Sequence, residues 1–282
     1  SAVDFYEYIK VNNLYDVDLI WETLLRTANM ADIKDRMQLN YILPRDCRLS
    51  TNESKAKVAL FIHMYYVDDL DDYLIYFSNF PKSADIYITT DTQSKIDVLR
   101  TATKNLGEDR IKIRKIQNQG RDVSALLIGL KDVVNDYDLI CFMHDKKTQY
   151  FKPYLIGESF KFHLLENILG STIYVENIIK TFEDNPRLGL LMPPPPIHST
   201  FSTLPGTEWQ VNYAETLKLA RKLGIGVPIT EARPPIAPLG TMFWFRPQSL
   251  RILFEHDFSY DDFPVEPNHP TDGTLMHQIE RI

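Results

Sequence analysis

The stretch YDLICFMHDKK, residues 137–147, decides the fold of this chain. Its apolar part, LICFM, has the length of a buried β-strand. The strand leads directly into His144, Asp145, Lys146 and Lys147. An imidazole, a carboxylate and two ammonium groups at the end of an apolar strand suit a ligand site, although a solvated loop after a buried strand carries charges as well.

Strands and helices alternate along the chain before this stretch. Strands are predicted over residues 57–66, 84–91 and 110–118, and helices over residues 68–80, 94–106 and 123–134. Alternation at this spacing predicts right-handed crossovers and a mainly parallel sheet that helices cover on both faces. We therefore expect an α/β fold of the Rossmann type, in which ligands bind at the carboxyl ends of the strands.

The N-terminal part of the chain has a different pattern. We predict a helical segment and linker over residues 1–54, followed by a domain over residues 55–282. One helix is predicted over residues 16–33, with Asp16 or Asp18 as its cap. The chain has no initiator Met and stops inside a predicted helix, so we expect it to be a piece of a longer protein.

The second half of the chain is less regular. Helices are predicted over residues 158–186 and 215–225, and a strand over residues 241–245 precedes a helix that Pro247 opens. Between them, residues 193–212 form a long loop that is rich in proline and aromatic residues. A loop of this length inside a compact domain is usually functional, so we expect it to shape a binding site together with the strand.

Composition limits the function classes. The 282 residues can form a full core, and a net charge of -7 with a pI near 5.5 argues against nucleic acid as the partner. Cys47 and Cys141 match no ligand spacing, so neither a disulfide framework nor a zinc site is predicted. The sequence has no membrane-spanning stretch and no signal peptide, so we expect a cytoplasmic protein, either free or peripheral at the inner face of the cell membrane.

Two motifs could bind phosphate groups. In QNQGRDVSALL, residues 117–127, Gly120 can take a positive φ, Asp122 can cap the next helix, and Arg121 can bind a phosphate beside the first amides of that helix. In HDKK the lysines can neutralise a diphosphate, and Asp145 could instead bind a divalent cation such as Mg or Mn. An ordinary strand-to-helix turn and a solvated loop are the alternatives.

Three other residues are candidates for work on a hydroxyl or a sugar. Asp272 precedes the last predicted helix, where it is either a helix cap, a general base or a hydrogen-bond acceptor for a sugar hydroxyl. Trp209 and Trp244 could offer flat apolar faces to a sugar acceptor, although such residues more often belong to the core. His277 lies within the predicted helix and is expected to be structural.

The order of the motifs resembles one family. KVALFIHMYY, IYITTD, QNQGRDVSALL, FMHDKK, GTMFWFRP and DGTLMHQIER follow one another as in the rhamnan synthesis protein F family. The resemblance covers nearly all of the chain, and VDLIWETLLRT resembles the stretch that precedes the transferase module. It implies a bacterial glycosyltransferase that helps to build rhamnose-containing cell-wall or surface polysaccharides.

That family is similar to the GT-A nucleotide-sugar transferases, which implies a GT-A-like sheet with a helical N-terminal segment. In GT-A enzymes the fourth strand ends in an Asp-x-Asp metal motif, whereas here His144 and Lys146 occupy the two acidic positions. The resemblance implies that lysines supply the positive charge of the metal, and it leaves metal dependence open. The implied donor-binding residues are His63, Asp91, Asn118, Gly120, Arg121, Asp122, His144, Asp145, Lys146 and Lys147.

The resemblance also implies a reaction. We expect rhamnose to be transferred with inversion from dTDP-rhamnose to a glycan or lipid-linked glycan, with Asp272 as the catalytic base. One alternative is a non-catalytic nucleotide- or glycan-binding module of a polysaccharide synthase. Another is a GT-A transferase that uses a different nucleotide sugar.

Overall fold

The structure is a computed structural model of the chain. It describes residues 2–146, 154–195, 208–265 and 272–282. The chain divides into two compact units, which we name the sheet unit and the helical unit. The sheet unit comprises residues 43–202 and 238–270, and the helical unit comprises residues 1–42, 203–237 and 271–282.

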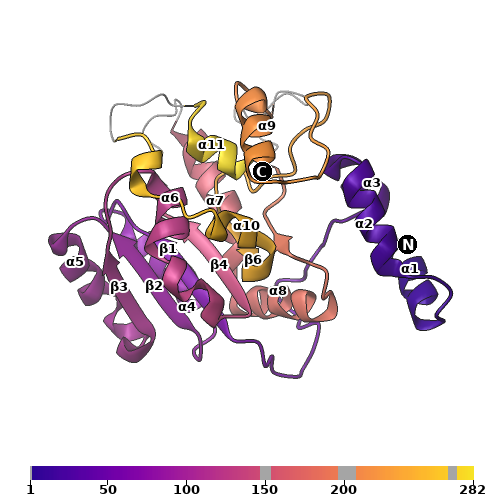
Figure 1. Cartoon of the computed structure of the whole chain (residues 1–282). Helices are drawn as coiled ribbons and strands as arrows, with labels where there is room; N and C mark the ends of the chain where they lie inside the picture. The colour runs from indigo at the N-terminus through magenta and orange to yellow at the C-terminus, as the bar shows by residue number, and fades with distance from the viewer. Residues whose placement is uncertain (1, 147–153, 196–207, 266–271) are drawn as a thin grey trace. The chain divides into compact units, whose positions relative to one another are not determined.

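A six-stranded sheet lies at the centre of the sheet unit (Figure 1). The strand order is β3-β2-β1-β4-β6-β5, with the bounds β1 (Val58–His63), β2 (Asp85–Thr90), β3 (Ile111–Lys115), β4 (Leu139–His144), β5 (Leu190–Leu191) and β6 (Phe243–Phe245). The first four strands are parallel, whereas β6 is antiparallel to both β4 and β5. The predicted α/β fold with a mainly parallel sheet is confirmed.

The central strands of the sheet are buried on both faces. Every residue of β1 is buried, as is typical of parallel strands that helices cover on both sides. Leu60 and Met143 belong to a core that also includes residues of α4 (Leu70–Ser78), α7 (Leu155–Leu169) and α8 (Thr172–Asp184). Water therefore reaches these strands mainly at their ends, and the carboxyl ends of β1, β2 and β4 lie along one edge.

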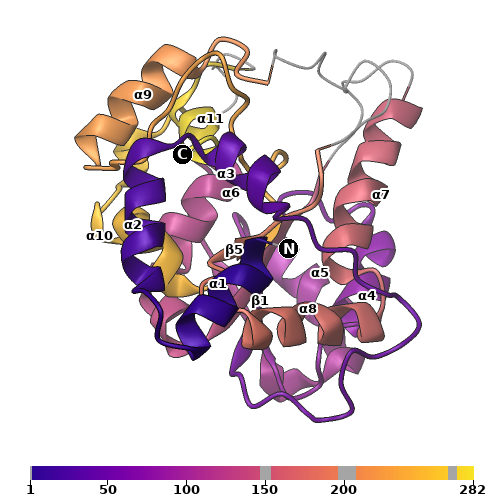
Figure 2. The ribbon, with the colours of Figure 1, turned by 90° about the vertical axis from the view of Figure 1, so that its right-hand side faces the viewer.

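The helix predicted over residues 158–186 is two helices, α7 and α8. The chain turns at Gly170 and Ser171, and the Ser171 side chain caps α8 by accepting a hydrogen bond from the amide of Tyr174 at 3.1 Å. Figure 2 shows α7 and α8 running in different directions. Apolar residues continue on both sides of the turn, which is why the periodicity alone did not reveal the break.

The helix predicted over residues 123–134 is also irregular. The chain forms α6 (Arg121–Ser124), then a π-helical turn (Ala125–Gly129), and then a 3-10 helix (Lys131–Asp136). π-helical turns are rare and are often found near functional sites. Between β2 and β3, α5 (Gln93–Thr103) agrees with its predicted position.

In the helical unit, the segment predicted as one helix contains two. These are α2 (Val17–Thr27), which Asp16 caps as predicted, and α3 (Met30–Met37), which Asn29 caps. The unit also contains α1 (Ala2–Val11), α9 (Tyr213–Lys222) and α11 (Leu275–Glu280). Asn29 donates a hydrogen bond to the carbonyl of Pro228 at 3.0 Å, so the segments of the unit are tied together across 199 positions of sequence.

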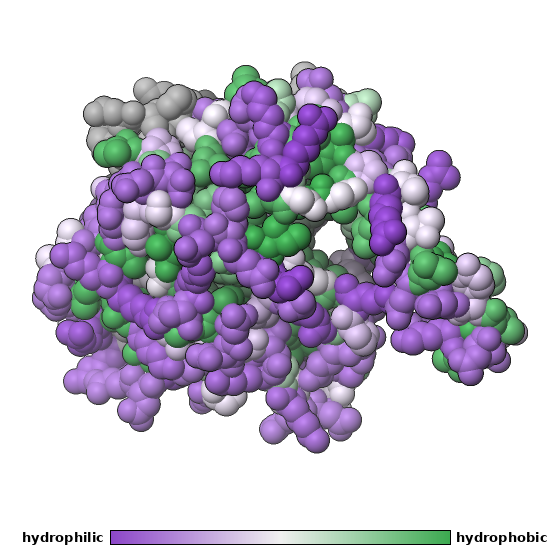
Figure 3. All heavy atoms as spheres, in the orientation of Figure 1, coloured by the Kyte–Doolittle hydropathy of each residue, from purple (hydrophilic) through white to green (hydrophobic). Residues whose placement is uncertain are grey.

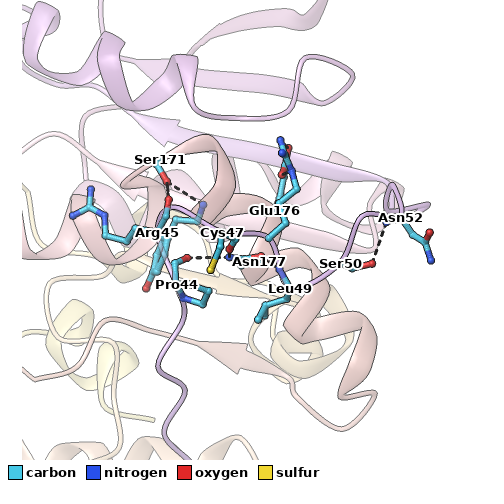
Figure 4. A network of polar contacts seen from close by, with 11 residues as sticks. Pro44, Arg45, Cys47, Leu49, Ser50, Asn52, Ser171, Glu176 and Asn177 are labelled. Carbon is cyan, nitrogen blue, oxygen red and sulfur yellow. Dashed lines mark hydrogen bonds and ion pairs between the residues drawn. The ribbon is translucent and has the colours of Figure 1, made fainter.

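Residues 44–52 form a strap that lies on α8 (Figure 4). The side chain of Asn177 is 1% exposed and donates to the carbonyls of Pro44 and Cys47, both at 2.9 Å. Its oxygen accepts a hydrogen bond from the amide of Leu49 at 2.8 Å. One buried carboxamide therefore fixes three main-chain groups of the strap.

The face of the molecule in Figure 3 is covered mainly by hydrophilic residues, with apolar residues in scattered patches. A helix needs about 20 mainly apolar residues to span a bilayer, whereas α7 has 15. Within the part of the chain that the structure describes, no helix is long and apolar enough to cross a membrane. The cytoplasmic location stays a prediction.

Candidate functional site

The carboxyl edge of the sheet brings several predicted residues together. His63 ends β1 and is paired in register with His144, which ends β4. Asp91 follows β2 directly and forms an ion pair with Lys95 at 2.6 Å. The charge of Asp91 acts on His63, so the ends of three neighbouring strands share one electrostatic environment.

The imidazole of His144 is held from both sides. Its Nδ1 lies 2.7 Å from the carbonyl oxygen of Asp145, and its Nε2 lies 2.9 Å from the carbonyl oxygen of Gly240. Carbonyl oxygens only accept hydrogen bonds, so both contacts are satisfied when both ring nitrogens carry a proton. The carboxylate of Asp122 is a third acceptor and lies 3.8 Å from Nε2.

Asp122 lies inside α6, so it does not cap that helix. Burial alone would raise the pKa of its carboxyl, but the charge of His144 and a hydrogen bond from Thr241 outweigh burial, and the pKa is lowered. The backbone of Thr241 has φ +54°, which is unfavourable for a β-branched residue, and Gly240 before it has φ +92°. Strained residues of this kind cluster at functional sites.

His63 is buried and neutral. The hydroxyl of Thr89 donates to the carbonyl of Ile62 at 3.2 Å, and its oxygen accepts from Nδ1 of His63 at 3.0 Å. Burial lowers the pKa of His63 to about 4, although the charge of Asp122 acts in the opposite direction. The two histidines at the ends of β1 and β4 therefore differ in their contacts, a hydroxyl for His63 and two carbonyl oxygens for His144.

Asp145 holds the loop after β1. It is 7% exposed, and its two carboxylate oxygens accept hydrogen bonds from the amides of Tyr65 at 2.9 Å and Tyr66 at 2.5 Å. Burial raises the pKa of its carboxyl in spite of these amides. The amide of Lys146 donates to the hydroxyl of Tyr73 at 2.8 Å. Asp145 and Lys146 therefore fix the path of the chain after β1 and β4.

The residues at this edge do not fit a divalent cation. Mg and Mn prefer several oxygen ligands, but both oxygens of Asp145 are engaged by main-chain amides, and Asp122 is paired with His144. Among the residues that the structure describes, no group of three or more His, Cys, Asp or Glu side chains could hold a metal ion. We derive no step that depends on a metal.

The turn before α6 has the backbone that the sequence predicts. Gly120 has φ +81°, and a Cβ atom there would lie 2.6 Å from Cγ of Phe263. Gln119 beside it donates to the carbonyl of Phe263 at 2.8 Å. Arg121 is exposed with φ +51°, and Asn118 is half-buried just before the turn.

A second cluster lies in the helical unit. The carboxylate of Asp272 accepts a hydrogen bond from Asn212 at 2.8 Å and lies 3.8 Å from Nδ1 of His277. Asn212 also donates to the carbonyl of Trp209 at 3.3 Å, so two predicted residues, Asp272 and Trp209, are linked by one carboxamide. The N-cap position of α11 is Thr274, so Asp272 is not the cap of this helix.

The sequence left two positions open for Trp209 and Trp244, a face for a sugar or the core, and both side chains are buried. Trp244 is fully buried in β6, stacks on Phe80 with ring centroids 5.5 Å apart, and donates to the carbonyl of Ile168 at 3.0 Å. This position leaves its ring no exposed face for a sugar. Trp209 is 4% exposed and donates to the carbonyl of Arg233 at 2.6 Å.

Some predicted residues lie outside the part of the chain that the structure describes. These are Lys147 and, within the loop over residues 193–212, residues 196–207. Sequence reasoning in turn missed Asn212 and Gly240, which contact Asp272 and His144. Asn212 belongs to no recognisable motif, whereas Gly240 opens the GTMFWFRP motif, where a glycine before a strand is a signal for an unusual backbone.

Comparison with known proteins identifies the family. The rhamnan synthesis protein F family matches the chain over residues 1–282. The chain belongs to this family. The sheet of this family member is Rossmann-like.

Two curated relatives are similar to most of the chain. The uncharacterized protein WxcX of Xanthomonas campestris pv. campestris strain B100 is 27% identical over 242 residues, which are 85% of this chain and 32% of WxcX. WxcX from a second strain of the same organism gives the same identity and coverage. The chain therefore spans about a third of the length of the curated relatives it matches.

Proposed function

We propose that this chain is a GT-A-like glycosyltransferase module that transfers rhamnose from dTDP-rhamnose, with inversion, to a glycan or lipid-linked glycan. The observation that carries the proposal is the arrangement at the carboxyl edge of the sheet, where Asp122 interacts with His144 and Lys146. The chain's membership of the rhamnan synthesis protein F family supports the same function. Ligands of open α/β sheets bind at this edge, which supports it as the place of the donor.

The donor diphosphate is assigned to cationic groups rather than to a metal. Lys146 lies two positions after His144 in the chain. Its ammonium group lies 4.6 Å from the ring centroid of Phe160. Lys147 and Arg121 are assigned to the same diphosphate. These charges would stabilise the negative charge that develops on the departing nucleoside diphosphate.

The reaction is a single displacement. The oxygen of the acceptor hydroxyl attacks the anomeric carbon and forms the new glycosidic bond, while the bond from that carbon to the diphosphate oxygen breaks. The bonding electrons leave with dTDP, and the hydroxyl proton passes to Asp272. His63, Asp91 and Asn118 are assigned to the nucleoside.

Incubation of the chain with dTDP-rhamnose, with and without EDTA, tests this proposal. We expect release of dTDP that EDTA does not suppress, and a weaker affinity for dTDP by calorimetry in Lys146→Ala. Arg187→Ala, which changes a cation elsewhere in the chain, is the matched control and should bind dTDP as the wild type does.

Three results would count against it. Release that depends on added Mg or Mn would return Asp145 to the role of a metal ligand. Binding of dTDP without release or transfer would favour a non-catalytic module, for which the loss of the Asp-x-Asp motif is the supporting observation. Faster turnover with another nucleotide sugar would change the donor.

A further inference from the structure

The carboxamide of Asn212 has a defined orientation. The residue is 0% exposed, and its Nδ2 donates to the carboxylate of Asp272 at 2.8 Å and to the carbonyl of Trp209 at 3.3 Å. Both partners can only accept hydrogen bonds, so the nitrogen must face them. The side-chain oxygen of Asn212 is buried and has no donor among the residues that the structure describes.

The backbone around Asn212 holds this side chain in place. The amide of Asn212 donates to the carbonyl of Trp209 at 2.9 Å, which closes a turn, and its carbonyl accepts from the amide of Thr216 at 2.9 Å, which starts α9. Arg281 donates to the carbonyls of Glu208 at 3.3 Å and His277 at 2.9 Å. The start of α9 and the segment that carries Asp272 are therefore cross-linked by two separate side chains.

The carboxylate of Asp272 is thereby oriented by a group that does not titrate. Asn212 donates to Oδ1, and the same oxygen lies 3.8 Å from Nδ1 of His277. Nδ1 of His277 also lies 2.7 Å from the hydroxyl of Thr274. Among the described residues, the side chains of Asn212 and His277 both approach Oδ1 of Asp272, so in the proposed reaction the proton-accepting oxygen is Oδ2.

We infer that Asn212 is a positioning residue that directs Oδ2 of Asp272 toward the acceptor hydroxyl. The inference rests on the proposed function, in which Asp272 takes the hydroxyl proton. Proton transfer requires the base to lie within hydrogen-bond reach of the hydroxyl, and a displacement of about 1 Å can lower a rate by about 100-fold. Burying the side-chain oxygen of Asn212 without a donor costs free energy, and the hydrogen bond from Asn212 to Asp272 offsets this cost.

Kinetics of Asn212→Ala test the positioning role. We expect kcat to fall by about 10- to 100-fold while the KM for dTDP-rhamnose stays within about twofold, because the donor does not contact Asn212 in this scheme. Thr216→Val is the matched control. Thr216 lies one turn further along α9, is fully buried, and its hydroxyl is also unpartnered among the described residues, so its kcat should not change.

The contact itself is tested by unfolding, which does not depend on turnover. The losses of stability in Asn212→Ala and Asp272→Ala should not add in the double variant, since the two residues share one interaction. Asn212→Leu, which keeps the approximate shape and removes the donors, replaces Asn212→Ala if the latter does not fold.

The outcomes distinguish a failure of the positioning role of Asn212 from a failure of the proposed glycosyltransferase function. Additive losses of stability, an unchanged kcat in Asn212→Ala, or an increase in KM alone would each overturn the positioning role while the glycosyltransferase proposal stands. Absence of any transfer by the wild type would overturn the proposed function, and the positioning role with it, even if the unfolding cycle reports the contact.

Discussion

Nε2 of His144 lies 3.8 Å from a carboxylate oxygen of Asp122, and their side chains are only 13% and 14% exposed. The ring also faces two carbonyl oxygens, so all three of its polar neighbours are hydrogen-bond acceptors. Removing one member of such a pair leaves the other charge without compensation, which costs more than the pair itself contributes.

His144→Phe should therefore lower the free energy of unfolding by about 3 kcal/mol, measured by urea denaturation at pH 7. The double variant His144→Phe/Asp122→Leu should regain part of this loss, because it removes both charges. Lys218→Ala breaks the exposed pair with Glu215 and should cost no more than about 0.5 kcal/mol. A loss in His144→Phe as small as in this control would mean that the ring is not charged.

His63 makes stability depend on pH. Its pKa of about 4 in the folded chain lies below the ordinary value of 6.5, so the unfolded chain takes up a proton first as the pH falls. The contribution is complete above about pH 6.5 and is lost as the pH falls toward 4. We expect about 2 kcal/mol less stability at pH 5 than at pH 7 from this group.

Urea denaturation at the two pH values measures this difference, and His63→Asn should reduce it by the same amount. His163→Asn removes a histidine that is not buried and should leave the difference unchanged. An equal pH dependence in wild type and His63→Asn would show that His63 does not stay neutral in the fold.

Alanine substitutions at Gly120 and Gly224 distinguish the stability lost to a steric clash from the stability lost to an unfavourable backbone conformation. Both have positive φ, +81° and +72°, but a Cβ at Gly120 would lie 2.6 Å from Phe263 and 2.8 Å from Ser124, whereas a Cβ at Gly224 meets nothing within 4 Å. Gly224→Ala should cost about 1 kcal/mol and Gly120→Ala about 3 kcal/mol in thermal or urea unfolding. Equal losses would mean that the turn before α6 moves away from Phe263.

Asn177→Ala should release the strap over residues 44–52. Three main-chain groups lose their partner, so the free energy of unfolding should fall by about 3 kcal/mol. Limited proteolysis should also cut faster within the strap. Ser54→Ala removes two exposed hydrogen bonds, one to Glu183 and one from the amide of Ala56, and serves as the control. Unchanged proteolysis in Asn177→Ala would show that other contacts hold the strap.

The sheet was predictable because its strands are buried and separated by helices. Four apolar segments of the right length, with turns between them, gave β1 to β4 in order, and the parallel pairing follows from the crossovers. The interruption at Gly170 could not be predicted in the same way, because the apolar period continues from α7 into α8.

The candidate site was predictable in its location but not in its contacts. The position of His144 at the end of a strand placed it at the carboxyl edge, yet its acceptor Gly240 is 96 positions away. Asp145 looked like a metal or phosphate residue, whereas its partners are main-chain amides that no motif encodes. Trp244 is in the core because its ring leaves β6 on a covered face of the sheet, where it packs on Phe80 and donates to Ile168 of α7.

The helical unit is assembled from three stretches of chain that are far apart in sequence. Asn29 bonds to Pro228, and Asp32 forms an ion pair with Arg233, so the first stretch stabilises the second. Deleting residues 1–42 would thus do more than shorten the protein. It would also remove the partners of Pro228 and Arg233, and the carbonyl of Arg233 accepts the indole hydrogen bond of Trp209, so loss of activity in such a truncation would not identify a catalytic residue within the deleted part.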